Sequence, residues 1–430
     1  MAQVLAPRLE AAIAELRERP ISGTEKGFGV PAPGAVVSAA SLGARRPSLF
    51  GPGFTMPVLV LRESAVAHNV TAMAAYCAAA GVRLAPHGKT TMAPQLFARQ
   101  LAAGAWAVTA ATVGELHVYR AFGVPRVLLA NELTDPAGAA WLAGELAADP
   151  GFECYVYADS LPGVRLLDEA VRQASPDRPL PVLVELGYPG GRTGCRGAAA
   201  AEAVARAVAR AGSLRLAGVA GYEGQLGRDR SPESVDRIAA YCRELRSLGE
   251  SLAAAGLAPD ELIISAGGSA FFDVVVQELA SGWAGQPAPL IVLRSGVYIA
   301  FDHGLYARVV PSPPPVFEPA LELWAHVLSR PEPGLALACA GRRDVAFDAG
   351  LPVPLRIRGR DGTLRQAVAM QAVKLDDQHC YLQLADGAEL EPGETICFGV
   401  SHPCTTFDKW RVIPVVDEDH RDVDAIHTFF

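Results

Sequence analysis

The sequence predicts an α/β protein in which a (β/α)8 barrel of the TIM type is followed by a smaller antiparallel β-domain. The chain has 430 residues, of which 50% are hydrophobic and 20% charged, so it can bury a large core and is not a disordered chain. From residue 57, short apolar runs alternate with longer alanine-rich stretches, which is typical of a parallel sheet wrapped by helices. After about residue 311, β-rich runs separated by turn signals replace this rhythm.

Residues 1–56 stand apart as an N-terminal helix and an irregular segment. Apolar residues recur at helical spacing in residues 1–20, and Pro20 ends the predicted helix. Residues 20–56 are rich in glycine, proline and serine and are therefore expected to form an irregular connection.

Residues 57–311 are assigned to the barrel. The predicted strands are 58–61, 83–86, 107–110, 126–130, 153–158, 181–185, 214–221, 262–266 and 291–296. The predicted helices between them include 64–80, 93–103, 112–122, 161–173, 198–211 and 231–255. Eight or nine such units match a (β/α)8 barrel, which has about 250 residues. A doubly wound open sheet is the alternative, although it usually contains fewer units.

Residues 312–430 are assigned to the β-domain, and prolines at 311, 313, 314 and 315 mark its start. The predicted strands are 321–328, 353–357, 367–373, 380–384 and 395–400. Pro-Gly and Asp-Gly pairs separate several of these runs, which favours antiparallel hairpins.

Charge and cysteine content exclude several classes of protein. The net charge of −8 and the lack of a basic run argue against a nucleic-acid or membrane partner. The N-terminus lacks the apolar core of a secretory signal, and the sequence contains no run of 18 apolar residues. Eight scattered cysteines without a CxxC pair indicate reduced thiols rather than a disulfide scaffold. We therefore expect a cytoplasmic enzyme.

The first candidate site is the segment PHGKT at 86–90, which follows a predicted strand. Active-site residues of a parallel barrel lie at this strand-to-helix edge. The amine of Lys89 can act there as a nucleophile toward a carbonyl group. A solvated loop lysine is the alternative.

Three further motifs follow predicted strands. The segment SAGGS at 265–269 offers backbone N–H groups and a hydroxyl to an anion, or is an ordinary turn. The segment GYPGGRTGCR at 187–196 carries two arginines, which can bind a phenolate, phosphate or carboxylate or lie on the surface. In GYEGQ at 221–225, a tyrosine and a carboxylate can serve acid–base chemistry or hold an aromatic ring, and a packed tyrosine is equally compatible.

The fifth motif, SHPC at 401–404, lies in the β-domain. His402 and Cys404 are two residues apart, so in an extended segment both side chains share a face and can reach one Zn²⁺. Two ligands are too few for a structural zinc site but are compatible with an open catalytic metal. Glu394, Asp408 and Asp344 are candidate partners behind these ligands, and surface roles are the alternative.

Taken together, these segments resemble a known family. They are PHGKT, TAATVGEL at 109–116, LLANEL at 128–133, GYPGGRTGCR, GYEGQ, SAGGS, RSGVYIAFDH at 294–303 and SHPCTTFDKWR at 401–411. The chain is similar to the fold-type III pyridoxal-phosphate enzymes, which have the alanine racemase-like fold. Within them it most resembles the branch of D-threonine aldolases and D-serine dehydratases. The resemblance extends from about residue 57 to the C-terminus.

The resemblance implies that the cofactor is pyridoxal 5′-phosphate and that Lys89 holds it covalently and then takes the Cα proton. Arg192 would lie near the phenolic oxygen of the cofactor or near the substrate carboxylate. The remaining implied cofactor contacts are Gly267, Gly268 and Ser269 at the phosphate, Tyr222 near the ring or phosphate, Gly296 and Tyr298 beside the phosphate, and His87. The site of such enzymes forms at the interface of a homodimer.

The resemblance also implies that His402 and Cys404 bind a divalent metal, for which the thiolate favours Zn²⁺. D-Threonine aldolases of the branch typically carry His-x-Asp, whereas His-x-Cys is the D-serine dehydratase form. The implied function is a metal-dependent lyase that converts D-serine, or a related D-β-hydroxy amino acid, to an α-keto acid and ammonia. The alternatives are a D-threonine aldolase, which releases glycine and an aldehyde, a non-catalytic pyridoxal-phosphate-binding protein, and a barrel without cofactor. A racemase would need a second base, which the sequence does not identify.

Overall fold

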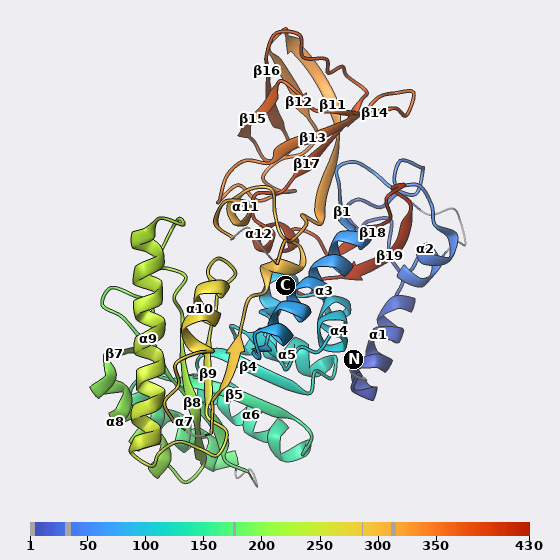
Figure 1. Ribbon diagram of the computed structural model, residues 1–430. Helices are drawn as coiled ribbons and strands as arrows, with labels where there is room; N and C mark the ends of the chain where they lie inside the picture. Colours follow the sequence, from blue (N-terminus) through green and yellow to red (C-terminus); the bar gives the residue numbers. More distant parts are fainter. Residues whose placement is uncertain (1–4, 31–35, 175–177, 286, 311–314) are drawn as a thin grey trace.

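A computed structural model describes residues 5–30, 36–174, 178–285, 287–310 and 315–430. The predicted boundary prolines at 311, 313 and 314 lie outside this part of the chain. A helix-wrapped parallel sheet forms one half of the molecule, and a second, mainly antiparallel sheet forms the other (Figure 1). This arrangement confirms the predicted fold class.

The parallel sheet is a barrel of eight strands. These are β2 (Arg83–Leu84), β3 (Val108–Ala110), β4 (Arg126–Glu132), β5 (Glu153–Ala158), β6 (Leu180–Gly187), β8 (Leu214–Gly221), β9 (Ile263–Ala266) and β10 (Leu290–Leu293). They pair in the order β2-β10-β9-β8-β6-β5-β4-β3, and β7 (Cys195–Arg196) adds to β6. A parallel bridge between His87 and Thr109 joins the two ends of this series and closes the barrel.

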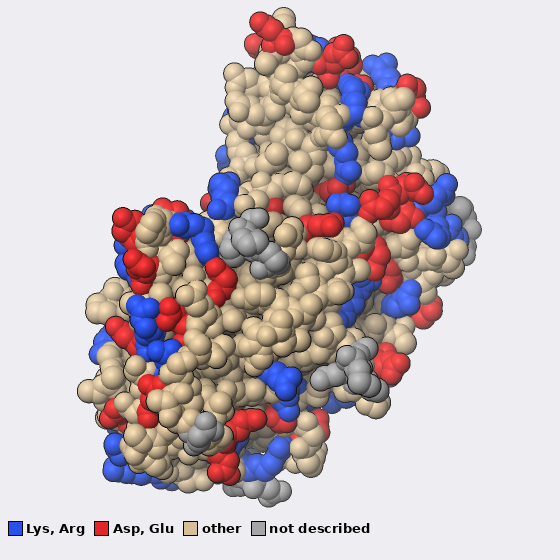
Figure 2. Space-filling view, in the orientation of Figure 1, with Lys and Arg blue, Asp and Glu red and all other residues tan. Residues whose placement is uncertain are grey.

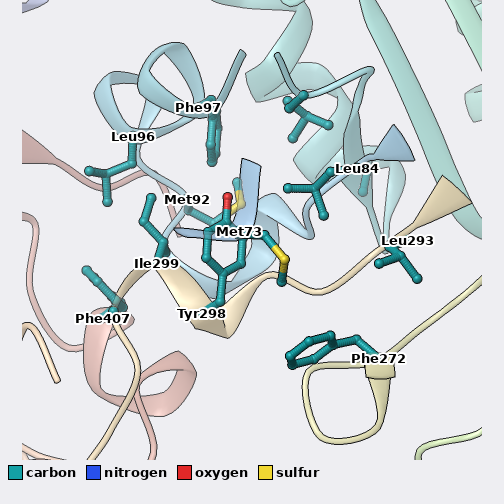
Figure 3. Close-up of a cluster of buried hydrophobic side chains, with 14 of the residues drawn as sticks. Met73, Leu84, Met92, Leu96, Phe97, Phe272, Leu293, Tyr298, Ile299 and Phe407 are labelled. Atoms are coloured by element: carbon teal, nitrogen blue, oxygen red, sulfur yellow. The ribbon is translucent and has the colours of Figure 1, made fainter. Parts of the chain in front are cut away.

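Helices α3 to α10 cover the outside of the barrel. They are α3 (Glu63–Ala79), α4 (Pro94–Ala102), α5 (Val113–Ala121), α6 (Pro136–Ala148), α7 (Leu161–Ala174), α8 (Ala198–Arg210), α9 (Pro232–Ala254) and α10 (Phe272–Leu279). Polar caps start several of them: the side chain of Asp135, for example, accepts the N–H groups of Ala137 and Gly138 at the start of α6. Figure 3 shows a buried cluster in which apolar side chains of α3, α4, α10 and β10 meet. Among the described residues, no helix combines the length and apolar character that crossing a bilayer requires.

The strand predicted at 58–61 does not belong to the barrel, and in this respect the prediction is wrong. Strand β1 (Val58–Arg62) pairs antiparallel with β11 (Leu321–Glu332) and parallel with β18 (Val412–Val416) in the second sheet. A short, fully buried apolar run carries no periodicity that reveals its sheet. Because α3 follows directly, the sequence imitates a strand–helix unit of the barrel.

The second sheet runs in the order β14-β13-β17-β11-β1-β18-β19 and is antiparallel except for the β1–β18 pair. Its other members are β13 (Val353–Arg358), β14 (Leu364–Gln366), β17 (Thr395–Gly399) and β19 (Asp422–His427), and β12 (Leu335–Ala338), β15 (Met370–Leu375) and β16 (Cys380–Leu384) extend it. The sequence did not predict β12, β14, β18 and β19. At the N-terminus, α1 (Pro7–Glu18) matches the predicted helix, whereas α2 (Ala39–Arg45) lies in the segment predicted to be irregular.

Short helices bring the two halves together at the mouth of the barrel. The 3-10 turn η1 (Gly88–Thr90) follows β2, and η2 (Val297–Ile299) and α11 (Leu305–Val309) follow β10. Helix α12 (Cys404–Phe407) from the β-domain contacts η1. Residues near 88 and 404 therefore meet, although more than 300 residues separate them in the sequence.

Asp422 gives a test of stability against pH. Its carboxylate is fully buried, neither oxygen has a hydrogen-bond partner among the described residues, and burial raises its pKa to about 8. Its pKa in the unfolded chain is about 3.9, so the stability linked to the neutral form is complete below pH 4 and is lost as the pH rises to about 8. The change in Tm that Asp422→Asn causes relative to the wild type should therefore be more favourable at about pH 9 than at about pH 5, by roughly 3 °C or more. Equal effects at both pH values in thermal melts would contradict this account.

Candidate active site

A cavity of 320 Å³ opens at the carboxyl ends of the barrel strands, where parallel barrels place their active sites. All of the predicted site residues except Tyr298 line it: His87, Lys89, Arg192, Tyr222, Gly267, Gly268, Ser269, Gly296, His402 and Cys404. The structure thus brings together motifs that are scattered over more than 300 residues of sequence.

A larger and more open hollow of 560 Å³ lies at the amino ends of β8 and β9, around Arg215, Asp260 and Glu261. It contains none of the five predicted motifs. The amino-terminal face of a parallel barrel usually serves stability rather than chemistry. We therefore take the cavity at the carboxyl ends as the site.

Lys89 lies in η1, directly after the first barrel strand. Its side chain is exposed and makes no hydrogen bond or ion pair with any described residue, so the amine is free to react in the cavity. Gly88 fixes the turn, because a Cβ atom there would lie 2.4 Å from the hydroxyl of Tyr119. The preceding His87 has a buried Nδ1 without a partner in the described chain, and desolvation, together with the charges of Lys89 and Arg294, holds its pKa well below the usual value.

The glycine pair after β9 contacts a buried carboxylate. The N–H groups of Gly267 and Gly268 donate to the two carboxylate oxygens of Glu223, at 3.1 and 2.6 Å. Glu223 is fully buried and must be hydrogen-bonded, and in this structure the two N–H groups meet that requirement. Glu223, for which the sequence allowed acid–base chemistry, is thus a buried, hydrogen-bonded carboxylate.

Further donors that suit an anion lie on the neighbouring turn, where they contact a hydroxyl group rather than a carboxylate. The N–H groups of Gly296 and Val297 converge on the hydroxyl oxygen of Ser269, at 3.3 and 3.2 Å. A Cβ atom at Gly296 would lie 2.5 Å from the carbonyl oxygen of His87, so only glycine fits this wall. The side chain of Tyr298 does not reach the cavity. Its hydroxyl accepts a hydrogen bond from Gln100 at 3.0 Å, and its ring packs in the buried cluster of Figure 3.

The two arginines of the loop after β6 have different surroundings. The guanidinium of Arg196 donates to four carbonyl oxygens of its own loop, those of Gly191, Arg192, Thr193 and Gly194, at 2.6–3.0 Å. Arg192 instead faces the cavity, with its guanidinium 4.8 Å from the centre of the Tyr222 ring. Arg196 thus organises the loop, and Arg192 is the cation presented to a ligand.

His402 and Cys404 face the same cavity from the β-domain. The Nδ1 atom of His402 is 2.7 Å from a carboxylate oxygen of Asp348, and Thr405 donates to the other oxygen at 2.8 Å. Burial lowers the pKa of His402, but Cys404 and Asp348 outweigh it and raise the pKa to about 9. The Sγ atom of Cys404 lies 3.5 Å from the hydroxyl of Thr90.

These donors suit a metal with open positions. An imidazole whose Nδ1 is held by a carboxylate presents Nε2 to a metal, which is a common arrangement behind metal-binding histidines. The described residues contain no group of three or more His, Cys, Asp and Glu side chains that could bind a metal. The predicted second partners lie elsewhere: Asp344 pairs with Lys26, Glu394 with Arg365 and Asp408 with Lys409.

Sequence analysis missed several residues of the cavity. Tyr157, Glu185 and Arg294 lie at or just beyond the ends of β5, β6 and β10, and a polar residue at the end of an apolar strand was a usable signal for each. Tyr306 in α11 carries no such signal, yet its ring centre lies 6.4 Å from that of His402. Burial and the charge of Cys404 raise the pKa of Tyr306 above its usual value.

The cavity fits pyridoxal phosphate by its donors and its size. It holds a free amine, two arginines, an N–H turn for an anion and an unpartnered imidazole nitrogen. Its volume lies within the range of about 300–1,000 Å³ that is usual for ligand and cofactor sites.

Comparisons with known proteins agree with this site. The family model "Alanine racemase, N-terminal domain" matches residues 61–278, and "Putative serine dehydratase domain" matches residues 320–416. The chain is 29% identical over 357 residues to a D-threonine aldolase of Arthrobacter sp., covering 82% of this chain and 86% of that protein. It is 26% identical over 372 residues to a 3-hydroxy-D-aspartate aldolase of Paracoccus denitrificans, covering 85% and 86%.

Solved structures show the same fold. The D-threonine aldolase from Filomicrobium marinum superposes with a TM-score of 0.74 at 29% identity, covering 87% of this chain and 94% of that one. The D-threo-3-hydroxyaspartate dehydratase from Delftia sp. HT23 gives a TM-score of 0.69 at 23% identity, covering 87% and 97%. Because the alanine racemase model alone spans residues 61–278, just over half of the 430 residues, the chain belongs to the alanine racemase-like family of fold-type III pyridoxal-phosphate enzymes.

Proposed function

We propose that this chain is a pyridoxal-phosphate- and metal-dependent lyase that converts D-serine, or a related D-β-hydroxy amino acid, to an α-keto acid and ammonia. The observation that carries the proposal is that His402 and Cys404 line the same 320 Å³ cavity as Lys89. A metal ligand pair beside a free amine combines the two functions that elimination of a β-hydroxyl requires, namely removal of a proton and stabilisation of a departing oxygen.

The residues around Lys89 support the cofactor half of the proposal. Pyridoxal phosphate supplies an electron sink that makes the Cα proton of a bound amino acid removable. Lys89 would hold the cofactor and, once released, accept the Cα proton on Nζ. The turn of Ser269, Gly296 and Val297 would bind the phosphate, and Arg192 would bind an anionic oxygen of the cofactor or the substrate carboxylate.

The β-domain supports the metal half. His402 and Cys404 would hold a divalent cation, and the soft thiolate favours Zn²⁺. Such a cation supplies Lewis-acid stabilisation of negative charge on an oxygen. Asp348 keeps the imidazole of His402 in one orientation. Because the described residues offer only this pair, the remaining positions of the cation stay open to substrate and water.

A second candidate function is a retro-aldol cleavage to glycine and an aldehyde. The D-threonine aldolase of Arthrobacter sp. and the 3-hydroxy-D-aspartate aldolase of Paracoccus denitrificans favour it. A metal beside the β-hydroxyl serves either reaction, so His-x-Cys in place of His-x-Asp is the feature that favours elimination here.

A product assay tests the two candidates. The purified holoenzyme is given D-serine or D-threonine, with and without chelator, and α-keto acid, ammonia and aldehyde are measured together, with the L-isomers as controls. Chelator-sensitive keto acid and ammonia from the D-isomers are expected. Release of glycine and an aldehyde would show that the function is that of an aldolase rather than a dehydratase. If no product is released, the proposed lyase activity toward these substrates is rejected.

We also propose that the active form is a homodimer with its sites at the interface. Exposed apolar side chains on neighbouring parts of the β-domain support this: Val353, Leu364, Val368 and Val373, with Val368 68% exposed. Figure 2 shows broad uncharged areas on the lobe that contains these strands. Light scattering should give twice the 45.1 kDa of one chain, and Val368→Asp should shift the mass toward one chain. A wild-type protein of single-chain mass would contradict the proposal.

We further propose a cytoplasmic location. All eight cysteines are free, which supports this location.

Arg196→Lys is expected to weaken cofactor binding about 10-fold, because one ammonium group cannot span the four carbonyl oxygens that the planar guanidinium joins. The loop would then hold Arg192 less firmly. Spectroscopic titration with pyridoxal phosphate measures the affinity, and Arg210→Lys at the exposed end of α8 is the control. An affinity equal to that of the control would show that Arg196 does not position Arg192.

A further inference from the structure

We propose that a buried acidic wall of the cavity, formed by Glu132, Tyr157 and Glu185, makes this site select D-amino acids with an uncharged, hydrogen-bond-donating side chain over those with a side-chain carboxylate. This inference rests on the proposed function and deepens it by naming the substrate class. Aldolases that act on a neutral and on an acidic D-amino acid are similar to this chain, so the choice is not set by similarity alone.

Three adjacent strands build the acidic wall. Glu132 ends β4 and is the register partner of Tyr157 on β5, and Glu185 lies near the end of β6. Tyr157 and Glu185 line the cavity and are only 2% and 4% exposed. Tyr157 and Glu185 therefore belong to the inner surface of the site, and Glu132 adjoins them from outside the lining.

Four polar atoms of the acidic wall receive no hydrogen bond from a fixed N–H or O–H donor of the described residues. They are the hydroxyl of Tyr157, one carboxylate oxygen of Glu185 and both carboxylate oxygens of Glu132, and all four are buried. Buried polar groups in folded proteins are normally satisfied by protein, water or ligand. A proton shared between Glu132 and Glu185 satisfies part of this pair, and its remaining oxygen lone pairs accept hydrogen bonds, so a partner that completes this wall must carry N–H or O–H groups.

The charges around the cavity point the same way. The arginines that line it are Arg192 and Arg294, and Arg294 already donates to Ser265 and to the carbonyl oxygen of Gly221. The anionic groups of the cofactor and the α-carboxylate of the substrate would both be paired with the positive charges of these two arginines. A second substrate carboxylate would find no further arginine in the described lining and would face Glu185.

The ionisation of Glu132 indicates that adding negative charge to the acidic wall is unfavourable. Burial and the neighbouring charge of Glu185 raise the pKa of Glu132 to about 8. The pair therefore retains a proton at neutral pH. A carboxylate brought into a cavity of 320 Å³ lies close enough to this pair for like-charge repulsion in a partly desolvated site.

An isosteric pair of ligands tests the proposal without the chemical step. D-Asparagine and D-aspartate have nearly the same shape, and only D-aspartate carries the second charge. Titration of the holoenzyme, followed by the visible absorbance of its cofactor, should show D-asparagine binding at least about 30-fold more tightly. Glu185→Gln should reduce this ratio to about 3-fold or less, whereas Glu233→Gln, on the exposed first turn of α9, should leave it unchanged.

Turnover provides the second readout. The kcat/KM for 3-hydroxy-D-asparagine should exceed that for 3-hydroxy-D-aspartate by about 100-fold in the wild type. If D-asparagine and D-aspartate bind with equal affinity, or if the two 3-hydroxy compounds have equal kcat/KM, the selectivity proposal is overturned. If no D-amino acid is turned over, the lyase activity fails, and the binding titration still decides the selectivity. Glu132→Gln, checked by its melting temperature, replaces Glu185→Gln if that variant does not fold.

Discussion

Lys89→Ala is expected to lower turnover of every D-amino acid substrate by at least about 10³-fold and to remove the visible absorbance of the bound cofactor. The reason is that Lys89 provides the free amine of the cavity, located in η1 where the first barrel strand ends. The variant should still fold, because the exposed side chain makes no hydrogen bond or ion pair with a described residue. Absorbance spectra and a coupled assay for keto acid measure the two effects.

Lys374→Ala is the matched control for this variant. Lys374 is an exposed lysine on β15 that pairs with Asp376, far in the sequence from the five motifs. Its replacement should change neither the spectrum nor the rate. If Lys89→Ala retained the cofactor band and the activity, the amine that binds the cofactor would have to be another lysine, and the assignment of the site would be wrong.

The sequence was sufficient to predict the barrel because each strand–helix unit repeats the same local pattern. It failed at 58–61, because a five-residue buried strand reads alike in a parallel and in an antiparallel sheet. The hydrogen bonds that place β1 beside β11 link residues more than 250 positions apart. Such pairing depends on the packing of the whole molecule, which local patterns do not contain.

For the candidate site, the sequence was sufficient to predict the location but not the contacts within it. Motifs at strand ends identified the cavity, since the topology of a parallel barrel brings those ends together. Contacts inside the cavity were not predictable. The carboxylate of Glu223 takes the N–H groups of two glycines that lie 44 and 45 residues further along the chain. The strand β10 ends at Leu293, so side chains no longer alternate at 297 and 298, and Val297 rather than Tyr298 faces the cavity.

Asp348 is the clearest contact that sequence analysis missed, since 54 residues separate it from His402. Three hydrogen bonds hold its loop against α12 and the turn that follows it: the N–H of Ala346 donates to Thr406, Thr405 donates to Asp348, and Trp410 donates to the carbonyl oxygen of Asp344. The loop therefore presents a carboxylate to Nδ1 of His402 in a fixed position. Carboxylates behind metal-binding histidines orient the ring and increase its basicity.

Asp348→Asn is accordingly expected to weaken metal binding about 10- to 100-fold, because the neutral amide no longer holds the imidazole of His402 with a charge. Competition with a chelator of known affinity measures the metal affinity directly. Turnover at low metal concentration should fall by a similar factor and should recover when the metal is in excess, since the ligands themselves remain. The visible spectrum of the cofactor should not change.

Two further variants distinguish a loss of His402 orientation from a general destabilisation of the β-domain. Thr405→Val removes the hydroxyl that donates to Asp348 and lies 3.2 Å from Nδ1 of His402, so it should lower metal affinity in the same direction by a smaller factor. Asp377→Asn changes an exposed carboxylate of the same domain, one that pairs with Arg343, and should have no effect on metal affinity. If Asp348→Asn bound metal as tightly as Asp377→Asn, the orientation of His402 would not depend on the charge of Asp348. The pair of His402 and Cys404 would then have to be regarded as a site without the carboxylate support that this fold supplies.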